Sequence, residues 1–204
     1  MRIISGKFKG RRITAPKNLP VRPTTDLSKE SLFNILNHQF TFRDLKVLDL
    51  FAGTGNISYE FASRGAAPIV SVDTDFGCVN FIKKTAQQFE MDITPIKSDV
   101  YKFLERAKTK YDVIFADPPY DFTQEQFEKI VTLVFENELL EDDGMLIIEH
   151  SPQTKMEEVA YFSNERRYSS CVFSFFEYEQ IETDEEDEDD EEDYDDDDID
   201  HEEE

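Results

Sequence analysis

The chain contains 204 residues, of which 39% are hydrophobic and 13% aromatic, enough for one domain with a sizeable core. Its 46 acidic and 22 basic residues give a formal net charge of -24, which taken alone argues against a nucleic-acid partner. The charge is unevenly distributed, however. Residues 182–204 hold 19 acidic residues and no Lys or Arg, so the other 181 residues carry a net charge of only -5. Residues 1–25 hold seven basic residues and no acidic one, which makes a nucleic-acid partner plausible at this end of the chain.

Cysteine usage and hydropathy indicate where the protein works. Cys78 and Cys171 lie far apart with no metal-ligand spacing, which argues against a zinc site or a disulfide framework. The N-terminus has no apolar signal-peptide segment, and no apolar run approaches the ~20 residues that cross a bilayer. We therefore expect a cytoplasmic protein that does not enter a membrane.

Short apolar runs alternate with longer amphipathic stretches in the middle of the chain, a pattern typical of βαβ units around a parallel sheet. The expected strands are residues 46–51, 69–73, 94–97, 112–116 and 145–149. The expected helices between and after them are residues 56–64, 76–90, 100–107 and 123–139. This order predicts an open α/β fold with helices on both faces of the sheet.

The segments outside this unit complete the predicted organisation. Residues 2–4 and 9–14 flank a turn at Gly6 and suggest a basic β-hairpin, and residues 26–37 have the apolar spacing of a helix capped by Thr25 or Asp26. Residues 159–162 and 168–178 suggest an antiparallel pair at the sheet edge. The expected divisions are a hairpin and linker at 1–25, a catalytic domain at 26–181 and a disordered acidic tail at 182–204.

A glycine-bearing turn follows the first predicted strand, and it is the first candidate ligand site. Gly53 and Gly55 lack a Cβ, so the backbone can turn sharply and approach a ligand. The third glycine of the dinucleotide fingerprint would fall at Ser58, and an acidic residue, Asp49, stands four residues before Gly53. A carboxylate there repels a pyrophosphate but can pair with a cation. This favours S-adenosylmethionine, whose amino and sulfonium groups are positive, as the cofactor.

Acidic residues at the ends of the next two strands suit the adenosine part of such a cofactor. Asp73 ends the second strand, where a carboxylate can bind the two ribose hydroxyls, although Asp75 competes for this role and also suits a helix cap. After the third strand, Asp99 could accept a hydrogen bond from the adenine amine, and Val100 could offer its backbone N–H to the ring. A helix cap is the alternative role of Asp99.

The fourth strand leads directly into Asp117, Pro118, Pro119 and Tyr120, at the edge of the sheet where α/β proteins bind ligands. The prolines stiffen the loop and remove N–H donors, so the Asp117 carboxylate and the Pro118 carbonyl can act together as acceptors. Two acceptors would orient the lone pair of an exocyclic amine towards a methyl group, while Tyr120 stacks on the base. We therefore predict that these four residues form the catalytic loop of an amine methyltransferase.

Taken together, the chain resembles the RsmD family of 16S ribosomal RNA guanine-N2 methyltransferases over roughly residues 1–180. The resemblance rests on residues 1–7 with 10–12, residues 22–26 with 29–36, residues 49–55 and residues 117–120. It departs from the family at residues 27–29, where an Arg often follows the Asp, and in the acidic tail. The resemblance implies a Rossmann-like Class I methyltransferase fold with a mostly parallel seven-stranded sheet and an N-terminal hairpin appendage. It also implies cofactor contacts from Asp49, Phe51, Gly53 and Gly55.

Two other functions remain open from the sequence. The loop at residues 117–120 serves an adenine N6 amine equally well, so only the N-terminal resemblance separates the guanine reaction from an adenine-N6 methyltransferase acting on DNA or RNA. A non-catalytic RNA-binding module of ribosome assembly would have no physical need of the Gly53 turn and Asp117.

We expect a monomer that contacts 16S ribosomal RNA or an assembling small subunit. The expected contacts are the basic residues Arg2, Lys7, Lys9, Arg11, Arg12 and Arg22.

Overall fold

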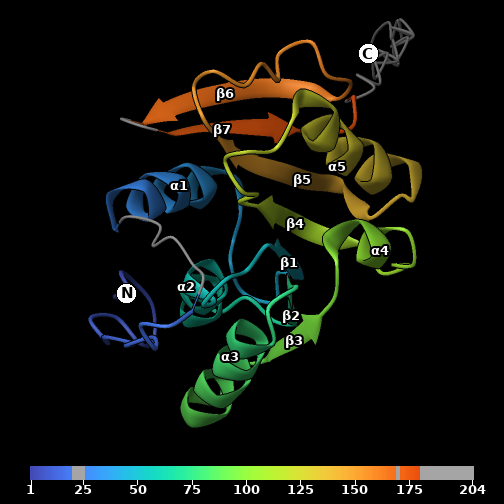
Figure 1. The fold of residues 1–204 in the computed structure, drawn as a ribbon. Coiled ribbons are helices and arrows are strands. Elements are labelled where there is room, and N and C mark those ends of the chain that lie inside the picture. Colours follow the sequence, from blue (N-terminus) through green and yellow to red (C-terminus); the bar gives the residue numbers. More distant parts are fainter. Residues whose placement is uncertain (20–25, 169–170, 180–204) are drawn as a thin grey trace, which may run out of the picture.

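In the computed structural model, residues 1–19, 26–168 and 171–179 are described, and Figure 1 shows them as one α/β unit. The helices of this part are α1 (Asp26–Gln39), α2 (Asn56–Arg64), α3 (Phe76–Phe89), α4 (Val100–Leu104) and α5 (Gln124–Glu136). Its strands are β1 (Val47–Leu50), β2 (Ile69–Asp73), β3 (Ile93–Lys97), β4 (Tyr111–Ala116), β5 (Leu140–His150), β6 (Phe162–Tyr168) and β7 (Cys171–Phe176). The predicted acidic tail, Arg22 and Thr25 lie outside the described residues.

The described strands form one seven-stranded sheet in the order β3-β2-β1-β4-β5-β7-β6. The first five strands in this order run parallel to one another, and β7 pairs antiparallel with both β5 and β6. The mostly parallel sheet and its antiparallel edge are therefore confirmed. None of the helices within the described ranges is long and apolar enough to cross a membrane.

Two apolar clusters cover the two faces of the sheet and make three layers. One cluster joins α1, α2, α3 and the N-terminal hairpin to the sheet, and the other joins α4 and α5 to the opposite face. The phenylalanines of β7, Phe173, Phe175 and Phe176, are buried in these clusters. Because both faces are covered, strands such as β1 are buried at every position and do not alternate between buried and exposed residues.

Local signals explain most helix boundaries. Gly65 ends α2 in the left-handed region with φ of 107°, which favours glycine. The side chain of Asp75 accepts a hydrogen bond from the N–H of Cys78 and caps α3. Thr123 caps α5 in a reciprocal capping box with Gln126. The predicted helix at 100–107 is shorter in the structure and ends at Leu104, and the N–H of Arg106 bonds to the carbonyl of Phe103 at 3.1 Å in a tighter turn beyond it.

The predicted strand at residues 159–162 is wrong. Val159 and Phe162 take part in successive turns, with their N–H groups bonded to Met156 and Val159 carbonyls at 3.1 and 3.2 Å, and β6 begins only at Phe162. As the edge strand, β6 packs against one neighbour and has no fully buried residue, so it does not need the apolar alternation used to predict strands. Its partner β7 lies within the predicted range 168–178.

The N-terminal hairpin is present and packs on the domain. Arg2 pairs with Arg12 in an antiparallel bridge, while Ile3 and Ile13 are buried in the same cluster as α1 and α2. At the turn, a Cβ on Gly6 would lie 1.8 Å from the carbonyl oxygen of Ser63. Only glycine therefore allows the hairpin to approach the end of α2 this closely.

A buried charge cluster attaches the hairpin to α1 and α2. The side chains of Lys29 and Glu60 are 1% and 0% exposed, and their charged atoms lie 3.4 Å apart. Lys29 Nζ donates to the carbonyl of Arg2 at 2.6 Å, and Glu60 accepts from the N–H groups of Ile4 and Ser5 at 2.8 and 3.0 Å. Arg64 Nε donates to the same carboxylate at 3.0 Å. One carboxylate thus serves two cations and two hairpin N–H groups.

Loss of the Glu60 charge should therefore destabilise the protein strongly. We expect Glu60→Gln to lower the free energy of unfolding by about 3–5 kcal/mol, since it leaves Lys29 buried without its counter-charge. Lys29→Met should cost less, because Glu60 keeps Arg64 and both N–H donors. Urea unfolding measures these changes.

Arg2→Gln is the control, because it breaks only the exposed ion pair with Asp26 and should cost less than about 1 kcal/mol. If Glu60→Gln were no more destabilising than this control, the buried cluster would not hold the hairpin.

Candidate active site

The strand order reverses between β1 and β4, and the loops that follow these strands meet at the carboxyl edge of the sheet. This switch point is where open α/β sheets form a ligand crevice. The ring centroids of Phe51, after β1, and Phe122, after β4, lie 5.5 Å apart in an edge-to-face contact. The two predicted motifs are therefore brought together and packed against each other.

The turn after β1 has a left-handed backbone at three positions. The φ angles of Phe51, Gly53 and Gly55 are 57°, 52° and 81°. A Cβ on Gly55 would also lie 2.8 Å from the ring of Tyr59, so both its conformation and its packing require glycine. Phe51 takes the same conformation without being glycine, which marks it as a strained residue at the site.

Asp73, the predicted ribose ligand, connects β2 to this turn. Its carboxylate accepts the N–H of Gly53 at 2.7 Å through one oxygen and the N–H of Asp75 at 2.8 Å through the other. Burial raises the pKa of Asp73, and these two N–H donors oppose that shift. The carboxylate therefore lies beside the glycine turn, in a position fixed by the backbone on both sides.

Asp49 lies deeper than the sequence suggested. It is 1% exposed, and its carboxylate accepts hydrogen bonds from the N–H and the hydroxyl of Ser58, whose hydroxyl also contacts Ser71 Oγ at 2.7 Å. Burial raises its pKa to about 7, the hydrogen bonds from Ser58 oppose the shift, and the charges of Asp117 and Asp73 add to it. Its contact with a cofactor stays a prediction, and its bonds in the structure hold the start of α2.

The two acidic residues with a possible capping role are both helix caps. Asp75 caps α3, as the sequence favoured, and Asp99 accepts the N–H of Lys102 at 3.0 Å as the cap of α4. Val100, the first residue of α4, is buried. Capping occupies part of the Asp99 carboxylate, and its contact with adenine stays a prediction.

The loop after β4 combines a partly buried acid with an exposed ring. Asp117 is partly buried, Pro118 is buried, and Tyr120 is 43% exposed. Beneath the loop, Phe122 packs against Phe51, Tyr101 and Phe127. This aromatic support fixes the loop, while the Tyr120 side chain stays accessible to a base.

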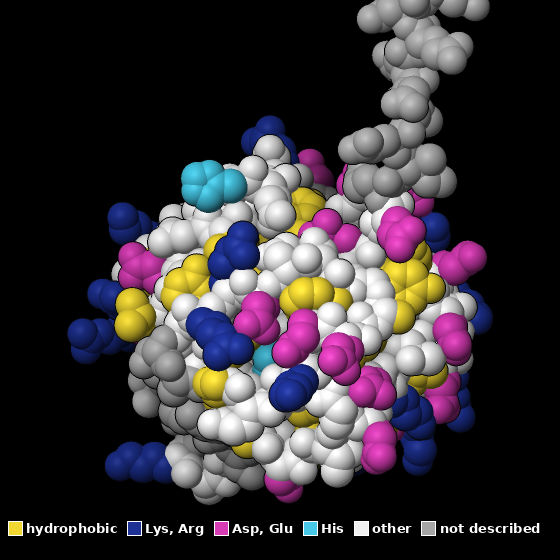
Figure 2. All heavy atoms as spheres, turned by 90° about the horizontal axis from the view of Figure 1, so that it is seen from above, with side chains coloured by type: hydrophobic (Ala, Val, Ile, Leu, Met, Phe, Trp, Pro, Cys, Tyr) yellow, Lys and Arg dark blue, Asp and Glu magenta, His cyan; other side chains and the backbone are white. Residues whose placement is uncertain are grey.

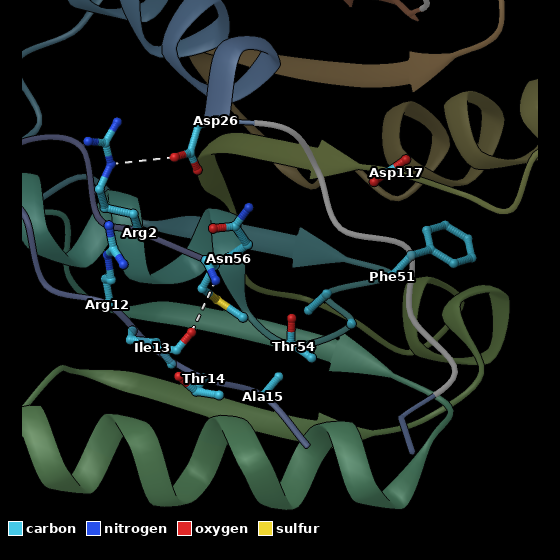
Figure 3. A pocket seen from close by; sticks show the side chains of 13 residues that line it. Arg2, Arg12, Ile13, Thr14, Ala15, Asp26, Phe51, Thr54, Asn56 and Asp117 are labelled. Carbon is cyan, nitrogen blue, oxygen red and sulfur yellow. Dashed lines mark hydrogen bonds and ion pairs between the residues drawn. The ribbon is translucent and has the colours of Figure 1, made fainter. Parts of the chain in front are cut away.

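A cavity of about 840 Å³ lies between the hairpin, the turn after β1 and Asp117. Figure 3 shows Arg2 and Arg12 at one end and Phe51 and Asp117 at the other, with Asn56 and Thr54 between them. The volume falls within the range of ordinary small-molecule sites. Its lining residues are Met1, Arg2, Arg12, Ile13, Thr14, Ala15, Asp26, Phe51, Ala52, Gly53, Thr54, Asn56 and Asp117.

Two residues that line the cavity, and the buried lysine behind one of them, were not predicted from the sequence. Asn56 and Thr14 line the cavity but were not predicted site residues. Behind Asn56, the buried Lys29 donates to its side-chain oxygen at 2.9 Å. A signal was available, because Lys29 precedes Leu32, Phe33 and Leu36 at the spacing of the apolar face of α1.

The predicted RNA-contact residues divide into two groups by location. Arg2 and Arg12 are exposed and line the cavity, while Lys7, Lys9 and Arg11 are exposed elsewhere on the hairpin. Arg22 lies outside the described residues. Among the residues whose positions are described, no group of three or more His, Cys, Asp or Glu side chains could hold a metal ion.

Comparisons with known proteins identify relatives over most of the chain. The family model described as Conserved hypothetical protein 95 matches residues 1–177. YlbH of Bacillus subtilis is 35% identical over 163 residues, covering 78% of this chain and 86% of YlbH. Ribosomal RNA small subunit methyltransferase D of Escherichia coli is 32% identical over 150 residues, covering 73% of this chain and 74% of that protein.

Solved structures confirm the predicted fold class. The structure of yhhF from Escherichia coli has a TM-score of 0.76 and 28% identity, covering 86% of this chain and 96% of that one. The 16S rRNA N2 G1207 methyltransferase RsmC of T. thermophilus, in complex with AdoMet and guanosine, has a TM-score of 0.64 and 21% identity, covering 78% of this chain and 45% of that one. The chain therefore has the Rossmann-like Class I methyltransferase fold.

The raised pKa of Asp49 makes a prediction about pH. The folded protein keeps the Asp49 carboxyl group protonated up to about pH 7, whereas the ordinary pKa of this group is 3.8. The stability that this difference contributes is therefore fully present below pH 3.8 and is lost as the pH rises through 7. Asp49→Asn should remove this dependence, so its stability should fall less than that of the wild type over this interval. Urea unfolding at successive pH values compares the two proteins. Parallel profiles would show that Asp49 is already ionised in the folded state at acidic pH.

Proposed function

The chain belongs to the RsmD family of methyltransferases, and on that premise we propose that it transfers a methyl group from S-adenosylmethionine to the N2 amine of a guanine in small-subunit ribosomal RNA. The observation that carries this proposal is the cavity in which Asp117, the Gly53 turn and the basic hairpin meet. The names of its relatives support the same substrate, since one of them is a ribosomal RNA small subunit methyltransferase. Ribosomal RNA as substrate also supports a cytoplasmic location. We further propose that the protein acts as a monomer.

The residues at the turn fit the proposed cofactor. Asp73 would bind the ribose hydroxyls beside Gly53, and Asp99 and Val100 would contact the adenine at the start of α4. Asp49, Phe51 and the left-handed turn would face the methionine part. When bound, S-adenosylmethionine supplies an electrophilic methyl group next to a positive sulfur.

The catalytic loop would orient the substrate amine. Asp117 and the Pro118 carbonyl would each accept one N–H of the guanine N2, which turns its lone pair towards the methyl group. The proton that the amine loses on methylation can pass to a carboxylate oxygen of Asp117. Pro119 limits the freedom of the loop, and Tyr120 would stack on a base that has left its own stack.

Removal of the Asp117 carboxylate should abolish methyl transfer without abolishing cofactor binding. We expect Asp117→Ala to lose about 3 kcal/mol of transition-state stabilisation, a factor of order 100, while the cofactor Kd changes by no more than a few fold. Asp117→Asn, which keeps one acceptor oxygen, should retain more activity. Single-turnover assays on unmodified 16S ribosomal RNA and titration calorimetry separate the two effects, and near-normal turnover of Asp117→Ala would remove this residue from the mechanism.

Nucleoside analysis by mass spectrometry tests the reaction itself. Ribosomal RNA treated with the wild type should gain N2-methylguanosine, and RNA treated with Asp117→Ala for the same time should gain on the order of 100-fold less. A gain of N6-methyladenosine would instead establish the adenine reaction. Cofactor binding with no methylated product would favour the non-catalytic assembly module.

The hairpin should supply phosphate contacts at the cavity rim. We expect Arg2→Gln with Arg12→Gln to lower the slope of log affinity against log salt by about 1.4, since each phosphate contact contributes about 0.7 on a single strand. Arg43→Gln with Lys108→Gln removes the same charge from exposed positions before β1 and β4, at the opposite edge of the sheet, and serves as the control. RNA binding assays over a range of salt give the slopes. Equal slopes for the two double variants would show that the hairpin arginines make no phosphate contact.

A further inference from the structure

The end of β6 lies at the same level of the sheet as the catalytic loop. One row of residues in register runs through Ala116 of β4, Ile148 of β5, Ser174 of β7 and Glu165 of β6. Because β7 is antiparallel to both of its neighbours, β6 runs in the same direction as β4. The residues that follow this row, Asp117 on β4 and Arg166 on β6, therefore lie at the same edge.

The distance between these two positions follows from the strand spacing. Three gaps between neighbouring strands separate β4 from β6, and at about 4.8 Å each they place the two backbones about 14 Å apart. Arg166 is opposite Phe173, whose side chain packs in the same cluster as Phe115 of β4 and the core residues of α1. Arg166 is therefore on the face of the sheet that carries α1 and the hairpin.

Arg167 occupies the next position and points to the other face. It is opposite Val172, which is in turn opposite His150 at the end of β5. Burial lowers the pKa of His150, and the charge of Arg167 acts in the same direction, which places that charge near the carboxyl end of β5. The side chain of Arg167 is 66% exposed, and its only ion pair among the described residues is with Glu165, two positions earlier on the same strand, at 3.0 Å.

We propose that Arg166 and Arg167 bind phosphates of the substrate RNA at the β6 end of the carboxyl edge of the sheet, with β4 between them and the hairpin. At 3.4 Å per stacked nucleotide, the 14 Å between strands corresponds to phosphates about four nucleotides from the target base. This inference rests on the proposed function and adds a second contact to it. The hairpin would hold the RNA on one side of the base and the end of β6 on the other.

The arrangement of the molecule supports this path. Figure 1 shows the hairpin, the first turn of α1 and the arrowheads of β4 and β6 on the same side. Figure 2, seen from above with the same side at its left, shows several Lys and Arg side chains along that margin, whereas acidic side chains mix with basic ones across the rest of the face. The margin at the carboxyl edge of the sheet thus carries basic side chains, on a face whose charge is otherwise mixed.

Charged side chains on an edge strand can also have a purely protective role. They deter pairing with the edge of another sheet, and β6 is such an edge. A protective role would appear in the oligomeric state and would leave RNA affinity unchanged. Phosphate binding instead predicts a change in affinity and in its salt dependence.

The test compares Arg166→Gln with Arg167→Gln against the control pair Arg43→Gln with Lys108→Gln, using unmodified 16S ribosomal RNA as the probe. We expect the β6 variant to lower the log–log salt slope by about 1.4, which corresponds to about 25-fold weaker binding at about 0.1 M salt. The control pair should keep the wild-type slope. Glu165→Gln, which removes the neighbouring carboxylate, should strengthen binding at low salt.

The outcomes separate this inference from the function on which it rests. If the wild type binds and methylates the RNA while the β6 variant matches the control, the β6 contact is wrong and the proposed function stands. If the wild type transfers no methyl group to any ribosomal RNA, the proposed function itself fails. Self-association of the β6 variant with unchanged RNA affinity would overturn the inference in favour of edge protection.

Discussion

The position of the hairpin wall of the cavity, and of Asn56 beside it, depends on the buried contact between Lys29 and Glu60. Two charges removed from water this completely are stable only when they are paired and hydrogen-bonded, and here all their partners belong to elements around the cavity. Glu60 bonds to the backbone of the hairpin, and Lys29 bonds to the backbone of Arg2 and the side chain of Asn56. Because an unpaired charge at this depth is costly, the hairpin cannot separate from α1 and α2 without a large loss of free energy. The basic rim of the cavity is therefore held in place by the core of the protein.

The carboxylates predicted to bind the cofactor also shape the backbone that would bind it. Asp73 accepts the N–H of Gly53, and Asp49 accepts the N–H of Ser58 in the first turn of α2. Each acid thus fixes the turn from one side, in addition to any contact with a ligand. These hydrogen bonds explain why the turn tolerates a left-handed Phe51, since they fix the backbone on both sides of it.

Much of this arrangement could be predicted from the sequence, because periodicity and caps are local. The ranges of β2 and α2 were predicted correctly, and the Thr123 cap and the Gly65 stop were visible as residue types. The edge strand β6 was misplaced because a strand without a fully buried residue lacks the apolar pattern. The Lys29–Glu60 pair was missed because it joins residues 31 positions apart on different helices, and only the fold brings them together. For the same reason, the alignment of Arg166 with Asp117 depends on strand register and not on any local motif.

The centre of the site is acidic, and its rim is basic. Asp49, Asp73 and Asp117 gather at the end of β1, and the charges of the other two add to the burial that raises the pKa of Asp49. Such a centre disfavours a phosphate and favours a cationic cofactor and an amine that can donate hydrogen bonds. The positive residues lie at the periphery, with Arg2 and Arg12 on the hairpin and, on our proposal, Arg166 and Arg167 at the end of β6. RNA would then be held by its backbone at the rim, and only the uncharged base could enter the acidic centre. This separation lets a protein with many acids near its reaction site still bind a polyanion.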